Sequence, residues 1–144
     1  MAKWQQGIFE PKNPEKYLGK HRPKYRSGWE LKFMRVCDNH PSIVAWASES
    51  HRIPYYNPIK KKNTVYVPDF FVVYEDKEGV RRAEFIEIKP SKQIIGAARS
   101  QEQKLQAVIN EAKWQAAKAF ASKQGVGFRV LTENELFNNT KKLK

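Results

Sequence analysis

Two carboxylates and a lysine lie in one stretch of this chain at a spacing that suits chemistry on a phosphate. The stretch runs from Val65 to Pro90 and reads VYVPDFFVVYEDKEGVRRAEFIEIKP. Its first arm carries Asp69 directly after a proline, and its second arm carries Glu87 and Lys89. Side chains alternate between the two faces of a strand, so Glu87 and Lys89 are expected on the same face. These residue types predict a site that binds a hard cation and hydrolyses a phosphodiester.

The spacing also predicts that the two carboxylates meet. The arms are typical of an antiparallel hairpin around the polar turn EDKEG, which is centred on residue 77. Opposed residues in such a hairpin have numbers with a constant sum, here about 154. Glu87 is then diagonal to Asp69, with about 5–8 Å between their side-chain bases, and a slip of two residues places them directly opposite. Either register lets both carboxylates reach one cation.

The ligand types favour Mg²⁺ or Mn²⁺ over zinc. Oxygen ligands suit hard cations, and we expect them from Asp69, Glu87 and the backbone carbonyl of Ile88. The three histidines are scattered, and none pairs with another His or Cys at metal-ligand spacing. Lys89 is predicted to orient the attacking water and to stabilise charge on the phosphate. Glu30 would complete the site directly or through water.

A simpler interpretation assigns these residues no chemistry. Asp69 and Glu87 would then be exposed hairpin carboxylates and Lys89 their salt-bridge partner, an arrangement that contributes little to stability. Glu30 stands three residues after Ser27, which is the pattern of a capping box at the start of a helix. The residues alone leave both interpretations open.

Hydrophobic periodicity predicts the elements that must position these residues. Apolar residues at helical spacing predict a helix from 27 to about 39, with Ser27 as its N-cap, and a longer helix from about 99 to 124. Short apolar runs predict strands at 43–46 and 128–131, and residues 48–59 fit either a loop or an irregular strand. A short capped helix is expected from 132 to about 138. A long helix between two strands favours a parallel crossover, so the predicted fold is α/β, with a mixed sheet flanked by helices.

Length and charge indicate one domain with a polyanionic partner. The chain has 144 residues and a formal net charge of +12. We expect a basic arm over residues 1–26, a single domain over 27–138 and a basic tail over 139–144. Nucleic acid is the commonest partner of such a charge, because each neutralised phosphate releases counterions. An acidic protein or a membrane surface is the competing interpretation.

Two groups of basic residues are predicted to hold a phosphate backbone. The N-terminal arm interleaves basic and aromatic residues, which suits such a backbone, and a solvated surface arm is an equal alternative. A second basic turn leads into the hairpin, one strand length before Asp69. The predicted phosphate contacts are Lys20, Arg22, Lys24, Arg26, Lys60, Lys61 and Lys62.

The sequence has the features of a soluble intracellular protein. No apolar run approaches the roughly 18 residues of a membrane span, and the N-terminus MAKWQQGIFE lacks the apolar segment of a secretory signal. The single cysteine, Cys37, excludes an intrachain disulfide and fits a reducing compartment. We therefore expect no membrane partner.

Glu30, the Pro-Asp pair ending at Asp69, and the run from Glu87 to Lys89 together resemble the PD-(D/E)XK superfamily, the restriction-endonuclease-like nucleases. In that superfamily a helix glutamate, a strand aspartate and a Glu-x-Lys strand form the metal site of an αβββαβ core. The order of the predicted elements matches this core over roughly residues 27–131. The resemblance implies a Mg²⁺-dependent nuclease in which Glu30, Asp69, Glu87 and Lys89 are catalytic.

A narrower resemblance concerns two groups within this superfamily. The segments YRSGWELKFMRVCD, VPDFFV and EFIEIKP make the chain similar to the small head-completion nucleases of T-even-type tailed phages and to the N-terminal nuclease domain of TnsA. TnsA has Gln where this chain has Glu87. The resemblance implies DNA as the substrate, which is cut or trimmed as a phage head is completed. It also implies phage head or portal proteins as partners, and residence in the host cytoplasm or the virion.

The alternative function is a DNA-binding or structural virion protein that keeps a nuclease fold without the activity, since a fold does not guarantee its chemistry. The sequence argues against such a loss, because all four expected residues are present.

Overall fold

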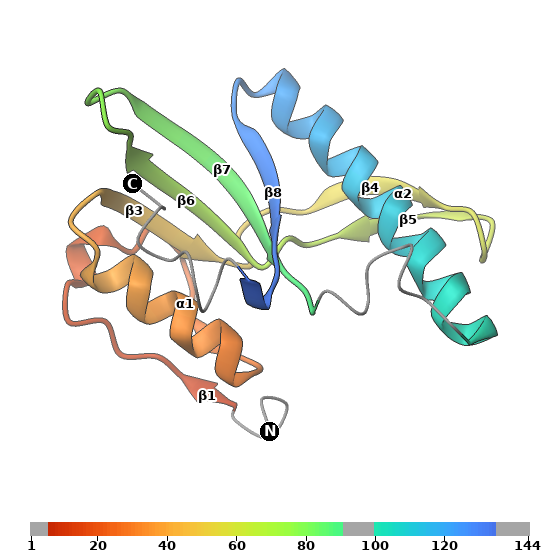
Figure 1. Ribbon diagram of the computed structural model, residues 1–144, viewed down its shortest axis with the longest axis horizontal. Coiled ribbons are helices and arrows are strands. Elements are labelled where there is room, and N and C mark those ends of the chain that lie inside the picture. Colours follow the sequence, from red (N-terminus) through yellow and green to blue (C-terminus); the bar gives the residue numbers. More distant parts are fainter. Residues whose placement is uncertain (1–5, 91–99, 135–144) are drawn as a thin grey trace.

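A four-stranded mixed sheet forms the centre of the molecule in the computed structural model, which describes residues 6–90 and 100–134 (Figure 1). The strand order is β3 (Ile43–Ser48), β6 (Phe70–Glu75), β7 (Arg81–Ile88) and β8 (Gly127–Leu131). β6 is antiparallel to both of its neighbours, whereas β8 is parallel to β7. The chain connects these two parallel strands through α2 (Gln101–Lys123). The predicted α/β fold and its parallel crossover are confirmed.

The first helix, α1 (Gly28–Asn39), covers one face of this sheet. Ser27 Oγ accepts the backbone N–H of Glu30 at 3.1 Å, which confirms Ser27 as the N-cap. The helix ends before a proline, and its apolar stripe carries Phe33, Met34 and Cys37 into the main core. The strand residues of that core are Ile43, Trp46, Phe70, Val72, Ile86, Ile88 and Leu131.

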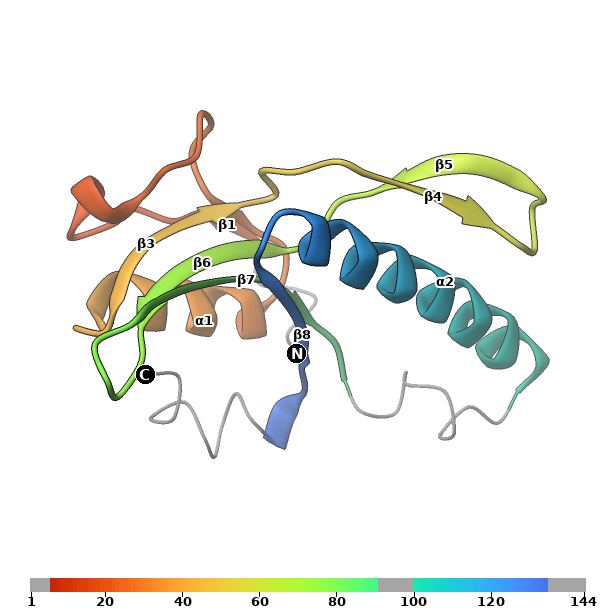
Figure 2. The same ribbon diagram turned by 90° about the horizontal axis from the view of Figure 1, so that it is seen from above.

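The second helix covers the opposite face together with a small separate sheet. That sheet consists of β4 (Ile53–Asn57) and β5 (Lys62–Tyr66), which pair antiparallel, and α2 runs along them (Figure 2). Phe85 of β7 contacts Phe120 of α2 with 5.9 Å between ring centroids, while its neighbour Ile86 packs into the core beneath α1. Because adjacent strand residues face opposite ways, α1 and α2 lie on opposite faces of the sheet.

The structure corrects the predicted hairpin. Its first arm is two strands, because the chain leaves β5 at Tyr66, passes the fully buried Pro68 and begins β6 at Phe70. Pro68 has no N–H to donate to a central ladder, so the strand starts after it, as the sequence indicated. The region 48–59, interpreted as a loop or an irregular strand, contains the regular strand β4.

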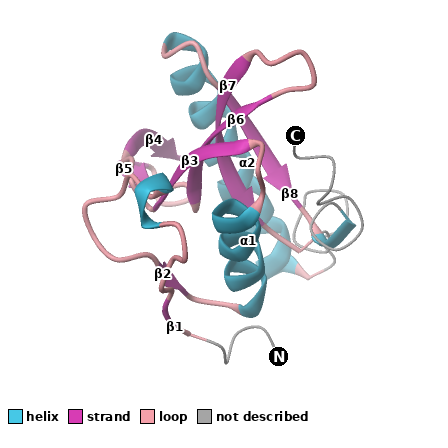
Figure 3. Cartoon of the chain, turned by 90° about the vertical axis from the view of Figure 1, so that its left-hand side faces the viewer, coloured by secondary structure: helices cyan, strands magenta, loops and turns pink. Residues whose placement is uncertain are grey.

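The N-terminal segment lies against α1 and β3 (Figure 3). It comprises β1 (Gly7–Ile8), a 3-10 turn, η2 (Pro14–Lys16), and β2 (Lys24–Tyr25), with β1 antiparallel to β2. Phe9 enters the main core, and the buried Asp38 carboxylate accepts the backbone N–H of Lys12 at 2.8 Å and that of Asn13 at 2.9 Å. These contacts anchor the segment to the fold.

Some predicted features lie outside the described residues: the connection at 91–99, the tail at 139–144 and most of the helix expected from 132 to 138. Within the described ranges no helix is both long and apolar enough to cross a membrane.

Candidate active site

Asp69 and Glu87 face each other where the β6–β7 hairpin meets the small sheet. The ladder pairs Phe70 with Ile86, so the numbers of opposed residues sum to 156 rather than the predicted 154. Extending this register by one residue places Asp69 directly opposite Glu87. The carboxylates therefore have the opposed arrangement and not the diagonal one.

The turn of the hairpin explains this two-residue difference. The Asp76 N–H donates to the Val80 carbonyl at 2.9 Å, and the Asp76 carboxylate accepts the N–H groups of Glu78 and Val80. Gly79 supplies the backbone conformation with φ of +78° that closes this turn. The turn is therefore centred one residue later than its composition suggested.

The Asp69 carboxylate takes the place of a strand neighbour beside β7. Its Oδ2 atom accepts the N–H of Ile88 at 2.8 Å. The N–H and C=O of an extended residue point to the same side, so the Ile88 carbonyl is also directed toward Asp69. Burial raises the pKa of Asp69 well above its ordinary value, and the charges of Glu87 and Glu30 raise it further. Asp69 thus lies where negative charge is already in excess.

Glu87 is a buried carboxylate, with 7% of its surface exposed. It accepts a hydrogen bond from the Tyr66 hydroxyl at 2.6 Å, and its other oxygen lies 3.6 Å from Lys89 Nζ. Burial raises the pKa of Glu87, while the Tyr66 hydrogen bond and Lys89 oppose that rise. The prediction that Glu87 and Lys89 share a face is confirmed. The interpretation of Glu87 as an exposed hairpin carboxylate is wrong.

Glu30 approaches from the N-terminal end of α1, and its carboxylate caps the chain. Glu30 Oε1 accepts the backbone N–H of Arg26 at 3.0 Å. The reciprocal bond of the capping box thus goes to Arg26 rather than to Ser27. Burial raises the pKa of Glu30, and the charges of Glu49 and Glu87 raise it further. Glu30 therefore has a structural role, and its charge acts on the Asp69–Glu87 pair as well.

Two residues that the sequence prediction missed adjoin this pair. Tyr66, from β5, donates its hydroxyl to Glu87, and burial and the Glu87 charge raise its pKa. Lys113, from α2, is half-buried, with Nζ 5.7 Å from the centroid of the Tyr66 ring. Burial lowers the pKa of Lys113, and the charges of Glu87 and Asp69 act against that shift. A helix that crosses from β7 to β8 must lie over one face of β7, and strand parity identifies it as the Glu87 face.

The donor set at this corner fits a hard cation. Mg²⁺ usually binds through one or two carboxylates and keeps several waters, so Asp69, Glu87 and the Ile88 carbonyl are sufficient ligands. A cation between the two carboxylates would offset the repulsion that raises the pKa of Asp69. Within residues 6–90 and 100–134, no three His, Cys, Asp or Glu side chains are already gathered for a metal. Glu30 is therefore not gathered with Asp69 and Glu87 around a preformed metal position.

The predicted phosphate-binding residues fall into two separate groups. Lys20, Arg22 and Lys24 are exposed on the N-terminal segment, whereas Arg26 pairs with Glu49 through Nε at 2.8 Å and Nη2 at 3.1 Å. Arg22 Nη1 lies 3.8 Å from Glu10. The other group, Lys60, Lys61 and Lys62, is exposed at the tip of the β4–β5 hairpin.

Comparisons with known proteins identify the family of the chain. Residues 40–133 match the family described as TnsA-like endonuclease N terminal. The chain is also 35% identical over 142 residues to the head completion nuclease of Enterobacteria phage T4, a match that covers 90% of this chain and 92% of that protein. The family match includes Tyr66, Asp69, Glu87, Lys89 and Lys113 and leaves out the α1 segment.

Proposed function

The chain belongs to the TnsA-like endonuclease N-terminal family, and on that premise we propose that it hydrolyses DNA phosphodiester bonds at the Asp69–Glu87 corner with Mg²⁺ or Mn²⁺. The observation that carries this proposal is the pair of opposed carboxylates, Glu87 buried and Asp69 partly buried, with Lys89 Nζ 3.6 Å from Glu87. Two carboxylates gathered in this way repel each other, so they lower stability unless a cation binds between them. Such arrangements are typical of functional sites.

Each residue has a role that follows from its position. When bound, the cation would polarise the scissile phosphate and lower the pKa of its bound water. Asp69 and Glu87 hold the site's negative charge, and Lys89 stands on the same face to stabilise charge that develops on the phosphate. The Tyr66 hydroxyl fixes one oxygen of Glu87, so its orientation is set before substrate arrives. Lys113 adds a second cation from α2.

The biological step follows from the relative. The similar phage T4 protein is named a head completion nuclease, so we propose that this chain cuts or trims DNA while a phage head is completed. Phage head or portal proteins are then its partners, in the host cytoplasm or in the virion. The formal charge of +12 supports DNA as the substrate.

Incubation of supercoiled plasmid with the purified protein and MgCl₂ tests the activity. We expect nicked or linear products from the wild type, none from Asp69→Ala or Lys89→Ala, and none in EDTA. Glu78→Gln, which changes an exposed carboxylate in the turn of the same hairpin, serves as the control and should cleave normally. DNA binding without cleavage by any of these proteins would instead identify a non-catalytic DNA-binding or structural virion protein.

A further inference from the structure

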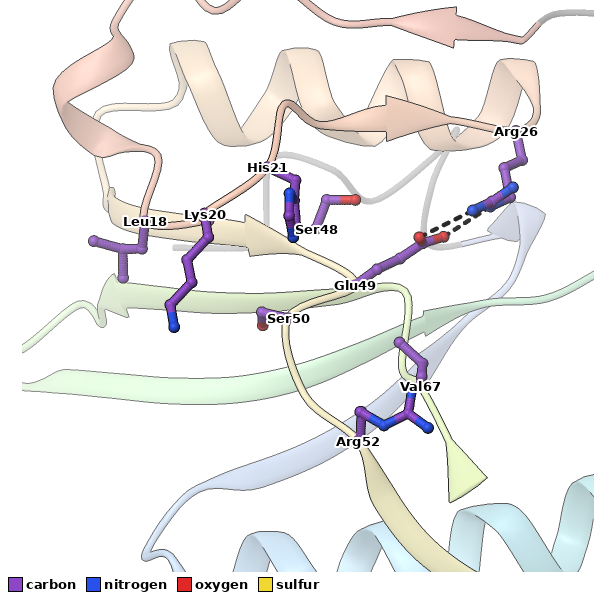
Figure 4. A pocket seen from close by; sticks show the side chains of 10 residues that line it. Leu18, Lys20, His21, Arg26, Ser48, Glu49, Ser50, Arg52 and Val67 are labelled. Carbon is purple, nitrogen blue, oxygen red and sulfur yellow. Dashed lines mark hydrogen bonds and ion pairs between the residues drawn. The ribbon is translucent and has the colours of Figure 1, made fainter. Parts of the chain in front are cut away.

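A basic pocket of about 710 Å³ lies beside the active-site corner (Figure 4). One part of its wall comes from the N-terminal segment, with Lys20, His21 and Arg26. The other part comes from the chain that follows β3, with Glu49 and Arg52. The wall thus combines segments that are far apart in the sequence.

The pocket and the active site share a stretch of backbone. Val67, two residues before Asp69, lines the pocket. The N–H of Glu49 donates to the Asp69 carbonyl at 3.0 Å, and the N–H of Arg26 donates to the Glu30 carboxylate. The pocket therefore lies next to the backbone that carries Asp69.

The charge of the pocket suits an anion. Its wall carries three permanent cations, Lys20, Arg26 and Arg52, against one carboxylate, Glu49. Within the part of the chain that the structure describes, no carboxylate forms an ion pair with Lys20 or Arg52. Two of the three cations are thus available to a ligand.

The third cation, Arg26, binds Glu49 in the geometry in which it would bind a phosphate. The two oxygens of Glu49 accept hydrogen bonds from Nε and Nη2 of Arg26 at 2.8 and 3.1 Å, the paired geometry in which arginine also binds phosphate. Figure 4 shows the Glu49 side chain extended toward Arg26. Glu49 also holds a left-handed backbone conformation with φ of +50°, which is unfavourable for a residue with a side chain and is often found at functional sites.

The size of the pocket selects among forms of DNA. A volume of about 710 Å³ equals a cube with an edge of roughly 9 Å, whereas the major groove of a duplex is by itself about 12 Å wide. A single strand can enter this space, whereas a duplex is wider and would lie across its mouth. The exposed ring of His21 offers an unpaired base a surface on which to stack.

We propose that this pocket binds an unpaired DNA strand next to the scissile phosphate, and that a backbone phosphate replaces the Glu49 carboxylate on Arg26. The substrate class is then a DNA end or branch that carries a single-stranded segment. The inference rests on the proposed nuclease function and adds the strand that the site receives.

Binding of labelled DNA in EDTA, where no cleavage occurs, tests this assignment. The probes are a duplex of about 20 base pairs that is blunt, or that carries a 5′ or a 3′ overhang of about eight thymidines. We expect the wild type to bind one of the overhang probes about tenfold tighter than the blunt duplex. Lys20→Ala/Arg52→Ala should lose this preference and lower the salt slope for the overhang probe by about 1.4.

A charge-matched control separates the pocket from general electrostatics. Arg35→Ala/Lys123→Ala removes two exposed cations elsewhere and should keep the overhang preference. Equal binding of blunt and overhang probes by the wild type, or an equal loss of preference in both double variants, would overturn the inference. Either result leaves the nuclease function intact if plasmid is still cut, whereas absence of all DNA binding and cleavage would overturn both.

The role of Glu49 has its own test. Glu49→Gln keeps the shape of the side chain but removes the charge that competes with phosphate for Arg26. We expect it to bind the overhang probe about fivefold tighter and the blunt duplex as the wild type does. Unchanged or weaker binding of the overhang probe would show that a phosphate does not replace this carboxylate.

Discussion

Glu84 and Glu87 lie on opposite faces of β7, and each accepts a hydrogen bond from a tyrosine and pairs with a cation. On the α1 face, Glu84 binds the Tyr74 hydroxyl at 3.1 Å and Arg129 through Nε at 3.0 Å and Nη2 at 2.5 Å. On the α2 face, Glu87 has the hydroxyl of Tyr66 at 2.6 Å and Lys89 Nζ at 3.6 Å. The two residues therefore have the same kinds of partner, but the cation lies closer to Glu84 than to Glu87.

The difference lies in the surrounding charge. The guanidinium of Arg129 donates two hydrogen bonds to Glu84, so the charge of that carboxylate is compensated. Glu87 has a more distant ammonium partner and faces a second carboxylate, Asp69. A carboxylate with a complete ion-pair partner supports the fold, whereas an incompletely compensated pair of carboxylates is suited to the proposed cation. In the proposed function, the face of β7 rather than the residue type decides which glutamate takes part in the chemistry.

The largest expected contrast is in catalysis. Glu87→Gln should lower plasmid cleavage by about 10²–10³-fold, because it removes a charge that the proposed cation requires. Glu84→Gln should cut near the wild-type rate at a temperature where it is folded. Initial rates of nicking in MgCl₂ measure both variants, and equal losses would remove the distinction between the two faces.

The two tyrosines offer a second contrast. Tyr66→Phe removes the 2.6 Å hydrogen bond that orients Glu87, so we expect about tenfold weaker Mg²⁺ binding. Tyr74→Phe removes the equivalent bond to Glu84 and should leave Mg²⁺ affinity unchanged. The comparison uses the Mg²⁺ dependence of cleavage. A larger effect from Tyr74→Phe would place the metal site on the α1 face and contradict this assignment.

Stability should change in opposite directions on the two faces. Without metal, Asp69→Asn removes repulsion and should raise the free energy of unfolding by about 1–2 kcal/mol. Glu84→Gln leaves Arg129 without its charged partner and should lower that free energy by about 1–2 kcal/mol. Urea denaturation in EDTA measures both changes. A destabilised Asp69→Asn protein would indicate that Asp69 supports the fold.

The smallest effect is the dependence of stability on pH. Burial, Glu87 and Glu30 raise the pKa of Asp69 in the folded state above its ordinary value of 3.8. Between these two values the folded protein binds more protons than the unfolded chain, so stability falls as pH rises through that window. The wild type in EDTA should therefore lose stability relative to Asp69→Asn as pH increases from about 4. Melting temperatures at several pH values test this. A wild type that gains stability relative to Asp69→Asn as pH rises would contradict the raised pKa of Asp69.

The sequence predicted most of what depends on local pattern. Helical periodicity placed α1 and α2, and strand alternation placed Glu87 and Lys89 on one face. The sequence left two registers for Asp69 and Glu87, diagonal and directly opposed, and the structure has the opposed one, since the register depends on how Gly79 closes the turn. Such backbone detail is set by hydrogen bonds in the turn that composition does not specify.

Contacts between segments that are distant in the sequence could not be predicted from local sequence patterns. β4 and β5 are stabilised by packing Tyr55 and Tyr66 against Trp114 of α2. β4 is short and contains Pro54, so its sequence alone gave a weak strand signal. The same packing carries Tyr66 to Glu87. Arg26 was predicted to contact phosphate, whereas its pairing with Glu49 depends on how the N-terminal segment meets the end of β3.

Titration calorimetry with MgCl₂ tests the central claim most directly. The wild type and Glu84→Gln should bind Mg²⁺ with the same affinity, and binding should disappear in Asp69→Asn and in Glu87→Gln. Each variant is compared at a temperature where circular dichroism shows it to be folded. Mg²⁺ binding that survives in both Asp69→Asn and Glu87→Gln would contradict the assignment of this corner as the metal site.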